Sequence, residues 1–180
     1  MTPVRRLACP LAPLLVAVVL TACATQRPAR DPTFVSGRLS VRVDAAGSQP
    51  VQTLSAAFEL QGDGDSGELR LNSPLGTRVA SARWTPGSAV LASGDGEQRF
   101  ATLDDLSRRA LGETVPLAAF PDWLAGRPWP GAPHQTSAQG FEQLGWQVQL
   151  ARRPEGFIEA HRTAPPAVLV RVRLDDVAVP

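Results

Sequence analysis

The chain of 180 residues contains no lysine and no tyrosine, and it has only two cysteines and two histidines. Its 18 basic residues, all arginine, nearly balance 17 acidic residues. It therefore lacks the basic surplus that is typical of nucleic-acid-binding proteins, and we expect no nucleic-acid partner. Cys9 and Cys23 both lie near the N-terminus, which excludes a disulfide framework for the rest of the chain. The folded part must be stabilised by its apolar core.

The sequence also lacks a recognisable catalytic or metal-binding motif. Neither His134 nor His161 accompanies a Gly-x-Ser-x-Gly nucleophile elbow or a partner cysteine. The acidic loops at residues 63–65 and 95–97 lack the ligand series of an EF-hand, and we interpret them as hairpin turns. No glycine-rich stretch opens a helix as a phosphate-binding loop does. We therefore expect no catalytic residues, no metal site and no enzymatic activity.

A short apolar stretch near the N-terminus ends in Leu20-Thr21-Ala22-Cys23. Two arginines precede it, and its apolar part is too short for the roughly twenty residues of a membrane-spanning helix. Small residues before a cysteine resemble the lipobox of bacterial lipoproteins, in which the thiol receives a diacylglyceryl group. We expect residues 1–22 to be a lipoprotein signal peptide, although an ordinary secretory signal is the alternative. Cys23 would carry diacylglycerol and an N-acyl chain, with no other cofactor.

Beyond this signal, the sequence predicts a tether and one domain. Residues 23–33 are polar and contain two prolines, so we expect a lipidated flexible tether, followed by a single domain over residues 34–180. Period-two alternation predicts half-buried strands, and the glycine-rich loop at 62–67 predicts an antiparallel hairpin. The predicted strands are 38–43, 54–61, 68–72, 79–84, 89–92, 98–101, 145–150, 157–160 and 168–174.

Two short helices are expected in the middle of these strands. Thr102 can cap the first helix and Gly112 can end it, while a second helix fits residues 121–125. Helices within an antiparallel meander indicate an α+β fold in which they cover one face or plug one end. Many inward strand positions hold Ala, Val or Leu, so a curved sheet can enclose an apolar cavity. A filled core is the alternative.

The turn Ser73-Pro74-Leu75-Gly76 carries a leucine where turns usually carry polar residues. Pro74 fixes its own φ angle and Gly76 is free to adopt a positive one, so the turn is tight. An exposed leucine on a stiff turn is suited to insertion into lipid. Alternatively, Leu75 folds back under the sheet.

Several segments, taken in order behind the lipobox, resemble the LolB family of outer-membrane lipoproteins. These segments are Ser36-Gly37-Arg38 and residues 71–76, 111–116 and 122–128. The resemblance implies a strongly curved antiparallel sheet that forms an incomplete barrel covered by short helices. It also implies a monomer, anchored in the outer membrane and facing the periplasm, whose apolar cavity accepts acylated lipoproteins from a LolA-like carrier. The receptor would then insert this cargo into the outer membrane.

The resemblance also assigns roles to particular residues. Pro74, Leu75 and Gly76 would form the membrane insertion loop. The second strand lacks the tryptophan often found in the family, and tyrosine is absent, so the cavity lining would be more aliphatic. Two other functions stay open, namely binding of a different lipid and a structural module for an envelope partner. The residues expected to form the cavity are Leu39, Val41, Phe58, Leu60, Leu69, Leu71, Val79, Trp84, Trp123 and Leu124.

Overall fold

The computed structural model describes residues 34–176. The expected signal peptide, Cys23 and the tether lie outside the described residues, as do residues 177–180. Among the described helices, none has the length and apolar character needed to cross a membrane.

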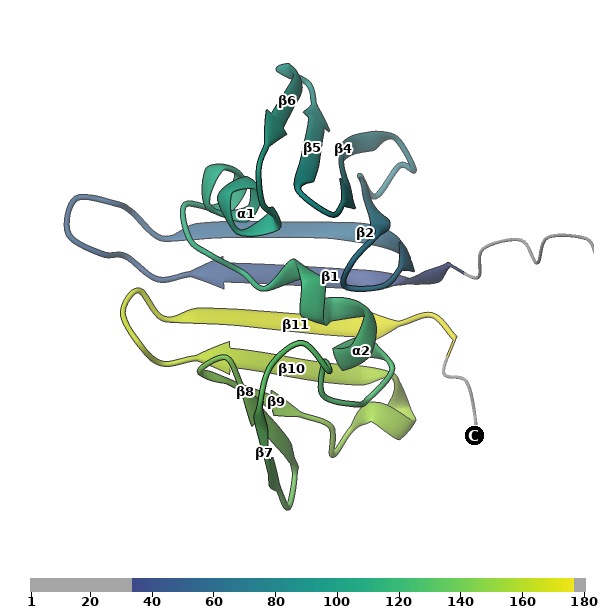
Figure 1. The fold of residues 1–180 in the computed structure, drawn as a ribbon, viewed down its shortest axis with the longest axis vertical. Helices are drawn as coiled ribbons and strands as arrows, with labels where there is room; N and C mark the ends of the chain where they lie inside the picture. Colours follow the sequence, from purple (N-terminus) through teal and green to yellow (C-terminus); the bar gives the residue numbers. More distant parts are fainter. Residues whose placement is uncertain (1–33, 177–180) are drawn as a thin grey trace, which may run out of the picture. The chain divides into compact units, whose positions relative to one another are not determined.

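Eleven antiparallel strands form one open sheet (Figure 1). Consecutive strands pair along the chain, except that β1 pairs with β11 and β6 does not pair with β7. The predicted hairpin of the second and third strands is confirmed as β2–β3. The strands are β1 (Val35–Val43), β2 (Gln52–Gly62), β3 (Gly67–Asn72), β4 (Arg78–Thr85), β5 (Ser88–Ser93), β6 (Gly96–Phe100), β7 (His134–Ser137), β8 (Gly140–Gln143), β9 (Trp146–Gln149), β10 (Phe157–Arg162) and β11 (Val168–Leu174).

The alternation in the sequence determines which side of the sheet becomes the core. In β1, Leu39 and Val41 are buried while Arg38 and Arg42 are exposed. Because side chains in a strand alternate between faces, the apolar residues of neighbouring strands meet on one face. The pairing of Val41 with Leu54 and of Leu39 with Ala56 shows this match between β1 and β2.

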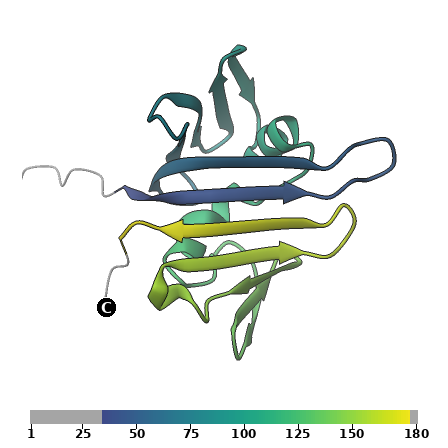
Figure 2. The same ribbon diagram turned by 180° about the vertical axis from the view of Figure 1, so that it is seen from behind.

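The helices lie in the connection between the two unpaired edges of the sheet. Between β6 and β7 the chain forms α1 (Leu103–Leu111), a 3-10 turn (Leu117–Ala119) and α2 (Phe120–Leu124). Seen from behind, strands β1, β2, β10 and β11 lie in front of the helices, so the helices cover the opposite face (Figure 2). The expected α+β fold, an incomplete barrel with short helices, is confirmed.

Local hydrogen bonds define both ends of α1 as predicted. The Thr102 hydroxyl accepts a hydrogen bond from the Asp105 backbone N–H and donates one to the Asp105 carboxylate. The hydrogen bonds that the Thr102 hydroxyl and Arg108 donate to the Asp105 carboxylate lower its pKa from the ordinary value. The ionised Asp105 carboxylate therefore stabilises the fold fully when the pH is above the ordinary pKa. This contribution is lost as the pH falls through the lowered pKa of the folded state. At the other end, Gly112 has a φ of 73° and closes the helix.

The sequence prediction missed the hairpin of β7 and β8, which begins at His134. All four residues of β7 are exposed, so the segment has no apolar alternation to reveal it. The second helix begins at Phe120 rather than at Pro121 and ends at Leu124. The strand predicted at residues 145–150 is shorter, because β9 spans Trp146–Gln149.

Beneath α2, an aromatic cluster surrounds one buried glutamine. The centroid of the Trp123 ring lies 6.1 Å from the ring centroid of Phe120, 6.3 Å from that of Phe141 and 6.1 Å from that of Trp146. Gln143 is only 1% exposed. Its side-chain oxygen accepts hydrogen bonds from the Trp123 indole and from a backbone N–H, and its amide donates to two backbone carbonyls. One side chain thus holds α2 and the following loop on β8.

We predict that Gln143→Leu lowers the free energy of unfolding by about 3 kcal/mol, because several buried polar groups lose their partner. Gln135→Leu, on the exposed strand β7, is the control and should change it by less than about 0.5 kcal/mol. Urea unfolding followed by tryptophan fluorescence measures both. Equal stability of the two variants would contradict the anchoring role of Gln143.

Candidate functional site: an apolar cavity and a protruding loop

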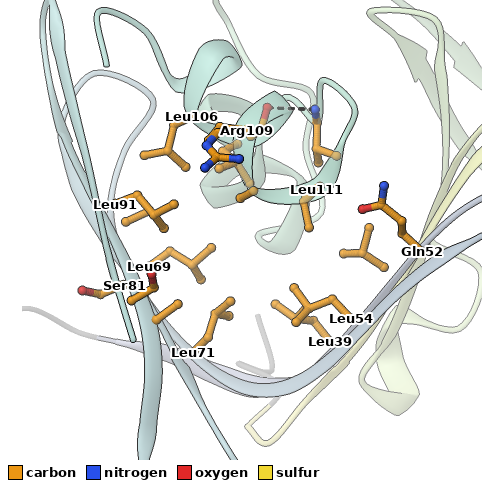
Figure 3. Close-up of a pocket in the computed structure, with 18 of the residues that line it drawn as sticks. Leu39, Gln52, Leu54, Leu69, Leu71, Ser81, Leu91, Leu106, Arg109 and Leu111 are labelled. Carbon is orange, nitrogen blue, oxygen red and sulfur yellow. Dashed lines mark hydrogen bonds between the residues drawn. The ribbon is translucent and has the colours of Figure 1, made fainter. Parts of the chain in front are cut away.

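A cavity of about 400 Å³ lies between the concave face of the sheet and α1. This volume falls within the range of small-molecule binding sites in proteins. In Figure 3, leucine side chains from the sheet and from α1 point into a common space. The aliphatic residues that line the cavity are Leu39, Val41, Val43, Leu54, Leu69, Leu71, Ala80, Ala82, Leu91, Leu106, Ala110, Leu111, Val115 and Leu117.

The depth and the mouth of the cavity differ in polarity. Leu69, Leu106 and Phe120 are buried, so they mark its apolar depth. Asp95 and Arg109 also line the cavity but are exposed, and they mark a polar mouth. Gln52 and Gln98 add amide groups to the lining, and the Arg109 guanidinium donates to Gln98 at 3.4 Å. The site can therefore bury an apolar chain while its polar end group stays near water.

The segment after α1 is held on the helix by a buried serine. The hydroxyl of Ser107 donates to the Asp104 carbonyl and accepts from the Val115 backbone N–H at 3.1 Å, the bond drawn in Figure 3. Arg108 also donates to the Thr114 hydroxyl. Because these bonds fix the chain beyond Gly112, Val115 is held in place as part of the cavity wall.

Four of the residues expected in the cavity lie in its lining, namely Leu39, Val41, Leu69 and Leu71. Phe58, Leu60 and Trp84 are buried in the core but do not line the cavity. The indole of Trp84 instead donates to the Asp63 carbonyl.

The sequence prediction was wrong about Val79, which is 45% exposed and does not line the cavity. Val79 and Trp84 are an odd number of residues apart, so in one strand their side chains point to opposite faces. Trp84 and Ala82 are buried, and Ala80 and Ala82, each an even number of residues from Trp84, line the cavity. The prediction mixed the two faces of this strand.

Trp123 and Leu124 were also expected in the cavity, but they do not line it. Both are buried, and they line a separate small hollow with Ile158 and Val170. The helix α2 therefore packs on β10 and β11, whereas α1 covers the cavity through Leu106 and Leu111. The apolar residues Leu106, Ala110 and Leu111 were the sequence signal that α1 covers the cavity, and the prediction did not use them.

Leu75 is 93% exposed at the tip of the β3–β4 loop, which excludes the alternative that it folds back under the sheet. Gly76 has a φ of 80° and its N–H donates to the Ser73 carbonyl at 2.9 Å. The Ser73 N–H donates to the Thr77 carbonyl, and the Thr77 N–H donates to the Ser73 hydroxyl. These bonds make a defined turn that presents the leucine to solvent.

The open sheet, the apolar cavity and the exposed leucine together define an open-barrel protein with an internal site for an apolar ligand. The family model for "Outer membrane lipoprotein LolB" matches residues 34–173. The chain therefore belongs to the LolB family, whose members are receptors that insert lipoproteins into the outer membrane. This confirms the family resemblance and the expected location at the outer membrane.

Individual relatives agree with the family match. The chain is 37% identical to the outer-membrane lipoprotein LolB of Bordetella petrii, over 72% of this chain and 70% of that one. It is 31% identical to the Chromobacterium violaceum protein of the same name, over 77% and 80% of the two chains. It is also 36% identical to the Bordetella parapertussis protein of that name, over 84% and 81%.

We predict that Ala80→Phe weakens binding of a fluorescent fatty acid about tenfold or more, because the ring enters the cavity. Val79→Phe is the matched control, since the neighbouring side chain lies on the exposed face. Fluorescence titration of both variants measures the difference. If Ala80→Phe binds the probe as tightly as Val79→Phe, the probe does not occupy this cavity.

Proposed function

We propose that the cavity under α1 binds the acyl chains of lipoproteins delivered by a LolA-like periplasmic carrier. The observation that carries this proposal is a 400 Å³ cavity with aliphatic walls and a polar mouth. The family consists of receptors, and we propose no chemical reaction for this chain. The chain acts as a monomer, and its partners are the carrier, the acylated cargo and the lipid of the outer membrane.

The transfer runs downhill in free energy and needs no nucleotide. Burying each methylene of an acyl chain contributes about 0.8 kcal/mol, so each acceptor must bury more of the chain than the donor did. The polar, exposed mouth at Asp95 and Arg109 leaves part of a bound chain outside the apolar depth. A bilayer surrounds every methylene with hydrocarbon. The receptor therefore binds cargo tightly enough to receive it and still releases it to the membrane.

Leu75 brings the release step to the membrane surface. Fully burying a leucine side chain contributes about 1.5–3 kcal/mol, and this contribution is not realised while Leu75 is exposed on its turn. Insertion of the turn 74–76 into the periplasmic leaflet realises it. The lining residues Leu71 and Ala80 pair with each other next to this loop, so the cavity wall extends to the base of the insertion loop.

Lipid at Cys23 keeps the receptor at this surface. A single acyl chain binds a bilayer only marginally, whereas diacylglycerol together with an N-acyl chain gives stable anchoring. The tether over residues 23–33 lets the domain meet a carrier in the periplasm and then contact the leaflet.

The proposal is tested by mixing the protein with a carrier loaded with a radiolabelled lipoprotein and following the label. Movement of the label onto this protein supports acyl-chain reception. Retention on a competent carrier would contradict it and would favour a structural lipoprotein. Native mass spectrometry of any bound lipid separates cargo from a different lipid, the remaining alternative.

We predict that Leu75→Glu slows insertion into liposomes about tenfold or more, because a carboxylate replaces the side chain that enters the leaflet. Cargo should then accumulate on the receptor, since the cavity is unchanged. Leu144→Glu replaces another exposed leucine at a turn and serves as the control. Insertion by Leu75→Glu at the rate of Leu144→Glu would show that Leu75 does not act in release.

A further inference from the structure

Half of strand β2 has no neighbour on one side. It pairs with β1 from Gln52 to Leu60, but it pairs with β3 only from Ala57 to Gly62. Within residues 34–176, no backbone group of residues 52–56 forms a hydrogen bond outside the ladder with β1. Alternate backbone N–H and C=O groups of such an edge are free to bind another chain. At about 3.4 Å per residue, this edge is about 17 Å long.

The edge is open because β3 ends, and β4 begins, before the sheet reaches the position beside residues 52–56. β3 ends at Asn72, opposite Ala57, and the β3–β4 register shifts between Leu71 and Asn72. The loop at residues 73–77 then turns away towards its exposed leucine. The position beside residues 52–56, which a longer β3 would fill, holds no described strand.

This edge contributes more residues to the cavity than either outer edge of the sheet does. Gln52, Thr53 and Leu54 all line the cavity. No residue of β7 does so, and α1 lies against β6, where Arg109 hydrogen-bonds Gln98. Among these three edges, the one on β2 thus contributes most to the cavity wall, and the end of α1 meets it at Gln52, whose side chain lies against Gly112.

We propose that residues 52–56 bind, as an added strand, the peptide segment that directly follows the acylated cysteine of a cargo lipoprotein. This inference rests on the proposed function, because acyl chains in the cavity place their cysteine at the mouth. From there the first residues of the cargo leave alongside β2. The added strand continues the sheet where β3 stops.

Main-chain pairing suits a receptor whose cargoes share a lipidated cysteine and differ in sequence. Hydrogen bonds to the backbone give affinity without requiring particular side chains. Thr53 and Ser55 are small, uncharged and exposed, so they neither clash with nor repel the residues of an added strand. The same gap borders the loop of Leu75, so the pairing holds the cargo peptide next to the insertion loop.

The test uses the full chain in nanodiscs with benzophenone attached at single introduced cysteines. Ser55→Cys reports on the edge, Leu71→Cys on the cavity, and Gln135→Cys on the exposed strand β7 as the control. The native Cys9 and Cys23 both lie in the N-terminal segment, and lipid blocks Cys23. The probe is a biotinylated short peptide on a triacylated cysteine, delivered from a carrier. Two further probes carry backbone N-methyl groups at either odd or even peptide positions.

We expect cross-links at positions 55 and 71 and none at 135. One N-methylated probe should lose the cross-link at 55 about tenfold, the effect of losing one or two backbone hydrogen bonds, while the other retains it. A cross-link at 71 without one at 55, or equal effects of both N-methylated probes at 55, would overturn the added strand alone. Absence of a cross-link at 71 would instead overturn acyl binding in the cavity, and the added strand with it.

Discussion

The unpaired gap between β6 and β7 is the constraint on which the site depends. All other neighbouring strands of this sheet are joined by backbone hydrogen bonds, and β1 and β11 bring the two ends of the domain together. Where the meander is interrupted, the chain crosses from one edge to the other through α1 and α2 instead of through a strand (Figure 1). A helix packs on a sheet through side chains, and its distance from the sheet depends on their size. Opposite medium aliphatic residues, α1 leaves a cavity; opposite β10 and β11, large aromatic side chains of α2 leave almost none.

The regions around α2 and around α1 therefore differ in their packing and in their function. Around Trp123, aromatic rings and the four hydrogen bonds of Gln143 fix α2 rigidly. Around α1, hydrogen bonds at Thr102 and at the buried Ser107 hold the helix and the following segment, while Leu106, Ala110 and Leu111 give the cavity its apolar cover. An apolar ligand can enter without breaking a polar contact of the core. The rigidly packed region around α2 thus supports the cavity under α1, which can bind and release a ligand, as a transfer protein requires.

The sequence predicted most of the sheet and only part of the site. Strands such as β1 were evident because Leu39 and Val41 alternate with exposed arginines. The strand β7 was not, because its four residues are all exposed and its place follows only from pairing with β8. Periodicity assigns a residue to a face and says nothing of how far the opposite wall lies. Phe58 and Leu71 thus looked alike, although only Leu71 borders empty space. The anchoring role of Gln143 likewise could not be predicted, because its hydrogen-bond partners are distant in the chain.

The central claim is that the acyl chain of the cargo occupies the space under α1. The most direct measurement is paramagnetic relaxation in methyl NMR spectra, with a nitroxide near the end of the acyl chain of a bound lipopeptide. The account predicts stronger broadening of the methyl signals of Leu54, Leu71 and Leu91 than of those of Leu75 and Leu144. Broadening confined to Leu75 and other exposed residues, with sharp signals from the cavity leucines, would contradict it.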